Sequence, residues 1–390
     1  MGLAVADVGW FNTENLFREA NGESSAVLLL SCMDVRVAWK KGLRPWSPVC
    51  ALRETEARIW ERTYVLPTGW MKTYPRLGMR PIARGIRRWW RQVGPEDRSA
   101  KFQRGLVISY PYYLHLRSQL RPDFTVYYNL DDYALYWPTI ADEVYALERE
   151  TVRVADVTVC VSKLRTDQLK AAVPEAAHKV YHLPHGTPSP FLSDHPLPLP
   201  ADPPEPLSHL PRPWLGFIGS LEDRLDWPLM NRLAEAHPGA SFIIIGRPPA
   251  PSDEPWYREC ARFLERPNVH ALGWRPQAML GRYYRTFDIN LIPYLIGHPF
   301  NEACNPTKIM DAMGATRPIV ATAIPECRLH PDLLHVADNA EDFLASVKSI
   351  LDRGSNDGLA IQRFELASQN TCRIVAARIF EYLEASRNVR

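Results

Sequence analysis

Short apolar runs alternate with amphipathic stretches through the second half of the chain. The apolar runs, most of them followed by glycine or proline, are 214–218, 241–245, 269–272, 289–293 and 319–322. Stretches with helical spacing of apolar residues are 226–237, 277–286, 306–314, 341–351 and 374–385. Uniformly apolar strands that alternate with helices are typical of a parallel sheet covered on both faces. This half is therefore predicted to be an α/β domain.

The first half shows the same alternation less regularly. Its candidate strands are 27–30, 106–109, 125–128, 157–161 and 179–183, with helices expected at 137–155 and 163–172. Ten prolines then fall between 188 and 213. Proline fixes φ and lacks an amide donor, so this stretch is predicted to be an extended linker. The expected domains are 1–205, which ends in this linker, and 206–390, which includes a C-terminal helix.

Composition and charge exclude several classes of protein. The 390 residues carry 46 basic and 44 acidic side chains, which argues against a surface that binds nucleic acid throughout. The seven cysteines form no CxxC pair and no Cys/His spacing, so we expect reduced thiols and no metal site. Neither a signal peptide nor an apolar run of about 18–20 residues is recognisable, and we expect a cytoplasmic protein.

The segment 301–314 carries the clearest candidate binding site. Pro306 follows Asn305 and is suited to the first turn of a helix. Lys308 would lie near the helix start, where the positive end of the helix attracts phosphate, and Asp311 lies on nearly the same face. Lysine and carboxylate together could bind the phosphates and the ribose hydroxyls of a nucleoside diphosphate. The alternative is an ordinary capped surface helix with one ion pair.

An acidic pair follows an apolar strand of the first half. Asp131 and Asp132 come directly after 125–128, at the carboxyl end where α/β sheets bind ligands. Adjacent carboxylates raise each other's pKa, which suits a general base. The alternative is that one of them caps the following helix.

The stretch from Trp70 to Arg91 is basic and aromatic. It has no acidic residue, and tryptophans stand at both ends; its basic residues are Lys72, Arg76, Arg80, Arg84, Arg87, Arg88 and Arg91, and its tryptophans Trp70, Trp89 and Trp90. Arginine attracts anionic headgroups and tryptophan prefers the membrane interface, so this stretch predicts contact with an anionic membrane. A solvated basic face is the alternative. Nucleic-acid binding would need the same charges, but no recognition motif accompanies them.

The order of motifs in the second half resembles the donor domain of the GT-B glycosyltransferases, in the large group 1 or family 4-like superfamily of exopolysaccharide and cell-wall enzymes. The pieces that carry the resemblance are LGFIGS at 215–220, FIIIG at 242–246, NVHALGW at 268–274, the segment 284–293 and NPTK at 305–308 through Val320. Three positions depart from the family pattern. Asp311 replaces a glutamate, Ala303 stands where a first glutamate is usual, with Glu302 beside it, and Arg224 is the single cation after Gly219.

The first half is compatible with the same family. The segment 126–133, VYYNLDDY, resembles the family's vYd-x-x-D-D segment, and 159–169 resembles its last strand and helix of this domain. Residues 183–187 resemble the family's IPNG turn, with His185 in place of asparagine. By this resemblance Asp132, then Asp131, would be the catalytic or acceptor-contacting acid, and His185 and Gly186 would line the cleft. The alternative for the last two is a simple tight turn.

The resemblance implies two Rossmann-like domains facing a cleft and transfer of a sugar from a UDP- or GDP-sugar to an acceptor hydroxyl. It implies no cofactor or metal, a polyprenol-linked or saccharide acceptor, and a peripheral position on the inner face of the cell membrane. The donor would be bound by Lys308, Asp311, Glu302, Asn305, Gly219 and Arg224. The alternatives are a nucleotide-sugar 2-epimerase on the same fold and a non-catalytic relative that binds sugar nucleotides.

Overall fold

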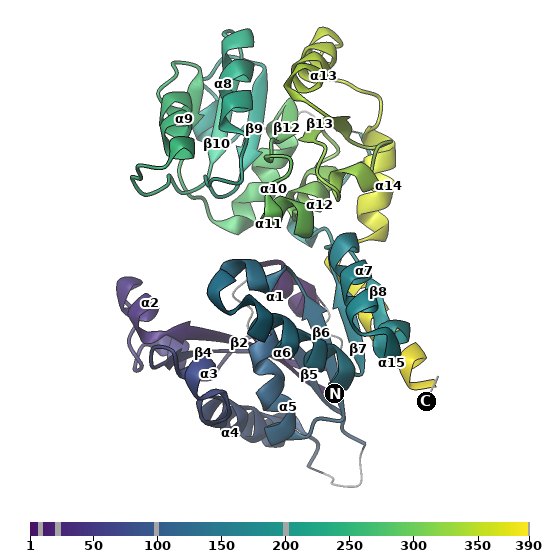
Figure 1. The fold of residues 1–390 in the computed structure, drawn as a ribbon. Helices are drawn as coiled ribbons and strands as arrows, with labels where there is room; N and C mark the ends of the chain where they lie inside the picture. The colour runs from purple at the N-terminus through teal and green to yellow at the C-terminus, as the bar shows by residue number, and fades with distance from the viewer. Residues whose placement is uncertain (7–10, 20–24, 97–100, 198–202, 389–390) are drawn as a thin grey trace. The chain divides into compact units, whose positions relative to one another are not determined.

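The computed structural model describes the chain apart from residues 7–10, 20–24, 97–100, 198–202 and 389–390 (Figure 1). The chain forms two compact units, one of Met1–Pro184 with Cys372–Arg390 and one of His185–Thr371. The boundary expected at 205/206 thus differs from the observed one, and the C-terminal helix α15 (Cys372–Asn388) belongs to the first unit. The reason is packing: Val375, Ile379 and Leu383 of α15 lie in the hydrophobic core of that unit.

The first unit is built on an eight-stranded sheet of order β3-β4-β2-β1-β5-β6-β7-β8. The strands are β1 (Gly2–Ala6), β2 (Ala26–Asp34), β3 (Arg53–Glu56), β4 (Ile59–Leu66), β5 (Arg104–Ile108), β6 (Phe124–Asn129), β7 (Val157–Cys160) and β8 (Val180–His182). All neighbours are parallel except β3, which runs antiparallel to β4. The five strands predicted for this half are confirmed, and β1, β3 and β4 were not predicted.

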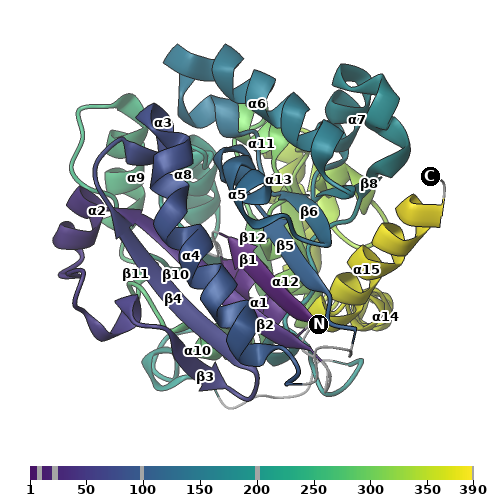
Figure 2. The same ribbon diagram turned by 90° about the horizontal axis from the view of Figure 1, so that it is seen from below.

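Helices cover both faces of this sheet. They are α1 (Phe11–Glu19), α2 (Val35–Lys40), α3 (Trp70–Thr73), α4 (Pro75–Val93), α5 (Leu114–Leu120), α6 (Ala141–Val154), α7 (Lys163–Ala172) and α15. Alternate residues of β1 face opposite sides: Ala4 packs in a core with α4 and α5, and Leu3 in a second core with α1 and α15. Figure 2 shows α4 lying over the strands of the first unit.

The second unit has a six-stranded, wholly parallel sheet of order β11-β10-β9-β12-β13-β14. Its strands are β9 (Trp214–Ile218), β10 (Ser241–Ile245), β11 (Val269–Ala271), β12 (Ile289–Ile292), β13 (Ile319–Thr322) and β14 (His335–Ala337). Its helices are α8 (Trp227–Ala236), α9 (Pro255–Leu264), α10 (Gln277–Thr286), α11 (Pro299–Ala303), α12 (Lys308–Gly314), α13 (Ala340–Asp352) and α14 (Ala360–Gln369).

The strand order of the second unit defines where a ligand would bind. Numbered within the unit, the order is 3-2-1-4-5-6, which is that of the Rossmann fold. The direction of strand addition reverses between β9 and β12, and ligands of such sheets bind at the carboxyl ends of the strands at this switch point. Among the described residues of 188–213, the prolines allow only two short 3₁₀ turns, Ser189–Phe191 and Glu205–Leu207.

Candidate functional site

The loops that follow β9 and β12 are joined at the switch point by one asparagine. The Asn301 side-chain amide donates to the carbonyl oxygens of Arg224 (2.8 Å) and Leu295 (3.0 Å). Its Oδ1 accepts a hydrogen bond from Arg224 Nε at 3.0 Å. Asn301 therefore holds both the backbone and the side chain of Arg224, and the asparagine itself is fully buried.

Lys308 lies directly against the glycine turn after β9. A Cβ on Gly219 would stand 2.5 Å from Lys308 Cε and 2.7 Å from its Nζ, so only glycine allows this approach. The ammonium donates to the Tyr294 hydroxyl at 2.9 Å. Gly246, at the end of β10, is equally constrained, because a Cβ there would stand 1.9 Å from the Gly219 carbonyl oxygen.

Two cations meet around Tyr294. Lys308 Nζ lies 5.4 Å and the Arg224 guanidinium carbon 5.6 Å from the centroid of the Tyr294 ring. Arg224 also lies 5.5 Å from the Phe300 ring centroid and donates from Nη2 to Cys304 Sγ at 3.1 Å. The structure thus brings together Lys308, Arg224 and Gly219, three residues expected in the donor site; that they bind a donor stays a prediction. Two fixed cations at a switch point are suited to bind the phosphates of a nucleotide.

Asp311 lies deeper in the protein than a surface helix would place it. The helix α12 begins at Lys308 rather than at Pro306. The turn before it is closed by a hydrogen bond from the Ile309 amide to the Pro306 carbonyl oxygen (3.1 Å), which spans three residues and not the four of an α-helix. Six of its seven residues are buried, so the alternative of an ordinary surface helix is wrong.

Asp311 is 6% exposed, and its buried Oδ1 has no hydrogen-bond partner among the described residues. Burial raises the pKa of Asp311 to about 8, and the nearby Lys308 opposes this rise. The group is therefore mostly neutral at pH 7, and a buried acceptor is left for a ligand.

Glu302 and Asn305 are held by their own loops. Glu302 Oε1 accepts a hydrogen bond from the Gly297 amide at 2.9 Å, which closes the turn before α11. Asn305 donates from Nδ2 to Glu326 Oε2 at 2.9 Å, and both side chains are buried. Glu326, in the loop after β13, was not predicted, and the sequence motif around Lys308 gave no signal for it.

In the first unit, the acidic pair lies just beyond the carboxyl end of β6. Asp131 accepts hydrogen bonds from the Asp132 amide at 2.9 Å and from the Tyr136 hydroxyl at 2.7 Å. Asp132 accepts from the Ala134 amide at 3.1 Å and so caps the short 3₁₀ helix Tyr133–Tyr136, as the capping alternative expected. Both carboxylates are buried.

Asp132 is also part of a buried ionic network that sequence reasoning missed. Its Oδ2 accepts from the Tyr145 hydroxyl at 3.1 Å and lies 3.3 Å from Arg165 Nη1. Arg165 pairs in addition with Glu148 at 2.5 Å, and the side chains of both are almost fully buried. Burial raises the pKa of Glu148, and Arg165 opposes this rise. A sequence signal existed: Glu148 interrupts the apolar stripe of α6, between Val144 and Val152.

His185 is the first residue of the second unit and is 5% exposed. Burial lowers the pKa of His185 to about 4, so the imidazole is neutral at physiological pH. Its Nδ1 has no hydrogen-bond partner within the described part of the chain. That His185 and Gly186 line a ligand cleft stays a prediction.

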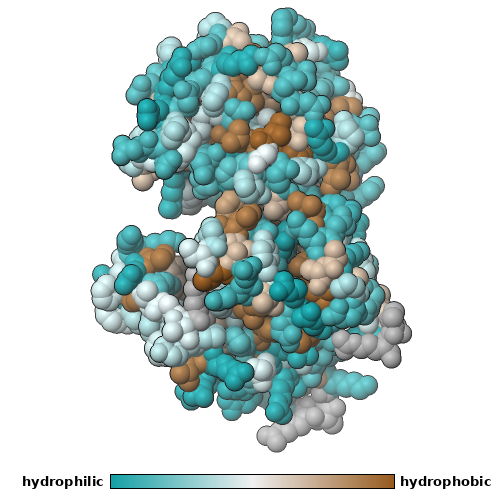
Figure 3. All heavy atoms as spheres, in the orientation of Figure 1, coloured by the Kyte–Doolittle hydropathy of each residue, from teal (hydrophilic) through white to brown (hydrophobic). Residues whose placement is uncertain are grey.

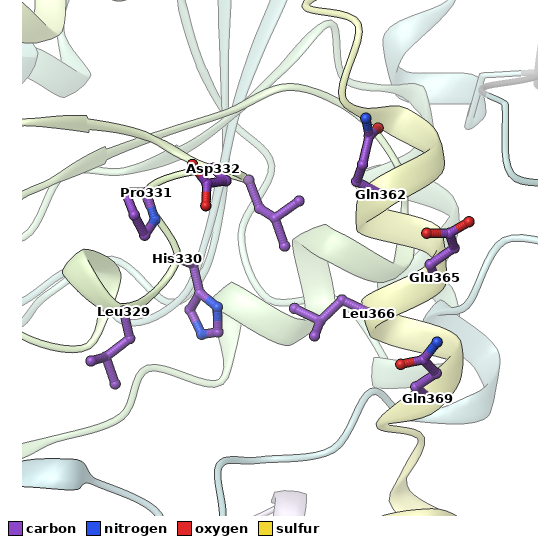
Figure 4. A pocket seen from close by; sticks show the side chains of 9 residues that line it. Leu329, His330, Pro331, Asp332, Gln362, Glu365, Leu366 and Gln369 are labelled. Carbon is purple, nitrogen blue, oxygen red and sulfur yellow. The ribbon is translucent and has the colours of Figure 1, made fainter.

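A separate pocket of about 360 Å³ lies in the second unit (Figure 4). It is formed by 329–333 and by one face of α14, and His330 and Leu366 extend toward each other across it. None of the predicted site residues lines it.

In the described regions no group of three or more His, Cys, Asp or Glu residues could hold a metal ion. No described helix is long and apolar enough to cross a membrane.

The fold is shared over the whole length with solved glycosyltransferase structures. Sucrose-phosphate synthase from Thermosynechococcus elongatus has a TM-score of 0.69, 15% identity and 100% coverage of both chains. Anabaena Alr3699/HepE in complex with UDP has a TM-score of 0.64 and 14% identity, over 98% of this chain and 99% of that one. An α,α-trehalose-phosphate synthase (UDP-forming) from Burkholderia vietnamiensis has a TM-score of 0.64 at 11% identity, over 98% and 99%. The chain therefore has the GT-B fold with two Rossmann-like domains, which confirms the predicted fold class.

Sequence comparison finds similarity in the second unit and to one curated relative. Residues 212–353 match the family model of the group 1 glycosyl transferases. TuaH of Bacillus subtilis (strain 168), whose name assigns it provisionally as a teichuronic acid biosynthesis glycosyltransferase, is 25% identical over 172 residues. That match covers 43% of this chain, and the chain spans 42% of the length of TuaH. Within its second unit the chain is thus similar to the group 1 glycosyl transferases, in agreement with the resemblance seen in the sequence.

Proposed function

We propose that the chain transfers a glycosyl group from a nucleotide sugar to an acceptor hydroxyl, in polysaccharide or glycolipid synthesis. The observation that carries the proposal is the meeting of Lys308 and Arg224 around Tyr294, beside Gly219 at the switch point. Several relatives are consistent with it by name: HepE was solved with UDP and with UDP-glucose, and the trehalose-phosphate synthase is described as UDP-forming. A UDP- or GDP-sugar is the donor that we propose.

The geometry suggests how the donor would be bound. Lys308 and Arg224 would contact the diphosphate and stabilise the negative charge that develops on the leaving nucleoside diphosphate. The unpartnered Oδ1 of Asp311 would accept a hydrogen bond from a ribose hydroxyl. Glu302 and Asn305, fixed by Gly297 and Glu326, would lie beside the transferred sugar.

In the first unit we assign the chemical role to Asp132, with Asp131 as second candidate. Arg165 and Tyr145 hold the Asp132 carboxylate in one orientation at the end of β6. A carboxylate fixed in this way is suited to contact the acceptor hydroxyl or the reacting sugar.

Nucleotide binding tests the donor site. Thermal unfolding is followed with UDP, GDP, ADP and dTDP, since a ligand that binds only the folded state raises the melting temperature. Lys308→Ala should weaken binding of the best nucleotide more than tenfold, because a charge-assisted contact to phosphate is lost. Lys348→Ala is the matched control, an exposed lysine of α13 that pairs with Asp352. Equal affinities of wild type and folded Lys308→Ala would remove Lys308 from the site.

Turnover tests the acidic pair. Asp132→Asn should leave nucleotide affinity unchanged and lower turnover by about a hundredfold, the usual contribution of a positioned acid or base. Asp167→Asn, an exposed acid of α7 paired with Lys163, is the control. Unchanged turnover in Asp132→Asn would leave this residue as a cap, and Asp131→Asn would then be measured.

The same reaction mixtures separate the alternative functions. Incubation with the nucleotide sugar alone would produce its 2-epimer if the chain were an epimerase, whereas a transferase needs an acceptor for efficient release of nucleoside diphosphate. A relative without catalytic activity would bind the nucleotide and release nothing.

We further propose a polyprenol-linked or saccharide acceptor and a peripheral position at the inner face of the cell membrane. The six arginines of α4 are all exposed, and this basic face would attract anionic lipid. Of the three tryptophans expected beside them, Trp70 is 37% exposed but Trp89 and Trp90 are not available to a membrane. Trp89 and Trp90 lie on the apolar face of α4 and are buried in the core, with Trp89 packed edge-on to Trp60.

A further inference from the structure

A different set of large apolar side chains of the first unit is exposed. They belong to α2, the loop after it, α3 and the start of α4, and we call them the aromatic edge: Val37, Trp39, Trp46, Trp70, Tyr74 and Leu77. Trp46 is 81% exposed and Trp39 and Tyr74 are each 59% exposed. Exposure of several aromatic rings in one region is unusual for a soluble surface and marks an interaction site.

The sheet explains why these side chains lie in one region. Strands β2 and β4 are parallel neighbours with Asp34 opposite Leu66, so the segments that follow them leave the same edge of the sheet. The Asp34 carboxylate accepts hydrogen bonds from the Arg36 amide at 2.8 Å and from the Thr68 hydroxyl at 3.1 Å. One side chain thus ties together the connections that lead to α2 and to α3. Figures 1 and 2 place both helices at the end of the sheet where β2 and β4 finish.

The two segments that carry the aromatic edge are basic, and the nearest acids along the chain, Asp34 and Glu54, lie just outside them. Segments 35–52 and 67–94 contain eleven lysines and arginines and no aspartate or glutamate. Arg36, Lys40 and Lys41 are exposed, and the Arg44 guanidinium lies 5.4 Å from the Trp39 ring centroid. In Figure 3 the lobe at the left, which corresponds to α2 in Figure 1, has a pale surface with brown side chains among hydrophilic ones.

We propose that the aromatic edge inserts into the headgroup region of an anionic bilayer, while the arginines of α4 contact lipid phosphates. Trp and Tyr rings, apolar with one polar atom, favour this depth, and Lys and Arg beside them complement anionic lipid. An apolar insertion together with a basic patch gives stable yet reversible attachment. This inference specifies the membrane contact of the proposed function. It rests on the proposed function only for the reason that the enzyme would need a bilayer.

Vesicle co-sedimentation tests the insertion. The full chain is mixed with vesicles of phosphatidylcholine alone and with added phosphatidylglycerol, at low and high salt. The double variant Trp39→Ser, Trp46→Ser should reduce binding to anionic vesicles on the order of tenfold and remove the part that survives high salt. Arg76→Gln with Arg80→Gln should instead reduce the part that salt weakens.

The matched control is Trp274→Ser, which removes a tryptophan of the second unit that is also 59% exposed. It should bind vesicles as the wild type does, and all variants should keep the melting temperature. Wild-type binding by the double variant, an equal loss in the control, or binding to a duplex RNA but to no vesicle would overturn the proposal. Loss of nucleotide-dependent stabilisation would contradict the donor site but not the aromatic edge, so the two failures are distinguishable.

Discussion

The contact between Gly219 and Lys308 allows the donor site to be tested without removal of a charge. In Gly219→Ala, the new methyl group would lie 2.5 Å from Lys308 Cε and 2.7 Å from Nζ. Both atoms are at the far end of a flexible side chain, so the lysine gives way to the methyl group. The positive φ of Gly219 (157°) adds backbone strain to an alanine at this turn, so the melting temperature of the variant is measured beside its affinity. The ammonium then loses its position beside the Tyr294 hydroxyl, now 2.9 Å away.

The expected effect follows from the strength of a charged hydrogen bond. A net loss of about 1.5–3 kcal/mol corresponds to a dissociation constant roughly 10- to 100-fold weaker for the nucleoside diphosphate. Calorimetric titration at fixed pH and salt measures it, with the matching nucleoside, which lacks phosphate, as second ligand. Affinity for the nucleoside should not change.

Gly239→Ala is the control, because no atom lies within 4 Å of a Cβ at that position of the same unit. It should bind the nucleoside diphosphate as the wild type does. If Gly219→Ala also binds with wild-type affinity, the ammonium does not contact phosphate from its observed position, and the reasoning for the donor site fails. An equal loss for nucleoside and nucleoside diphosphate would point to general damage at the turn.

Three further predictions concern stability, each measured by urea unfolding. The pKa of Asp311 is about 8 in the fold against about 3.9 in an unfolded chain, so wild type should lose stability as pH rises from about 4 to 8, by at most roughly 5 kcal/mol. Asp311→Asn should lack that slope and be the more stable protein above pH 8; parallel pH profiles would contradict the assignment. Arg165→Met leaves Glu148 buried without its cation and should lower the unfolding free energy by about 3–5 kcal/mol, whereas a loss below about 1 kcal/mol would mean that the ion pair is dispensable. Gly216→Ala places a Cβ 2.0 Å from the buried Phe287 ring and should cost about 1–3 kcal/mol, with partial rescue by Phe287→Leu.

The fold was predictable from sequence wherever strands are buried on both faces. β9, β10 and β12 are apolar apart from Ser241 and Asn290, because helices cover both sides of their sheet, and that pattern is visible without a structure. β3 is exposed along its whole length, so no apolar signal marked it. In α4 the arginines concealed a buried helical stripe that includes Met79, Ile82 and Ile86. Trp89 and Trp90 belong to this buried face and were assigned to the wrong surface.

The candidate site was predictable only in part, because motifs reveal what is close along the chain. Gly219 belongs to the motif that ends strand β9, and Lys308 to the motif that begins helix α12. Both motifs are expected at the carboxyl ends of the strands, so the proximity of the two residues could be expected. Tyr294, which both cations of the site contact, and Arg165, which holds Asp132, are brought in from other elements by tertiary packing. Side-chain pairing of that kind leaves no periodic pattern in the sequence.

The return of α15 to the first unit has a consequence for synthesis of the protein. Core positions beside β1 and α1 are filled by Val375, Ile379 and Leu383, which the ribosome adds only after the whole second unit. At ordinary elongation rates the first unit waits on the order of tens of seconds with that face uncovered. Chaperone capture of the nascent first unit is therefore expected until α15 emerges. A premature stop codon shortly before Cys372 would leave the second unit entire and the first one unfinished.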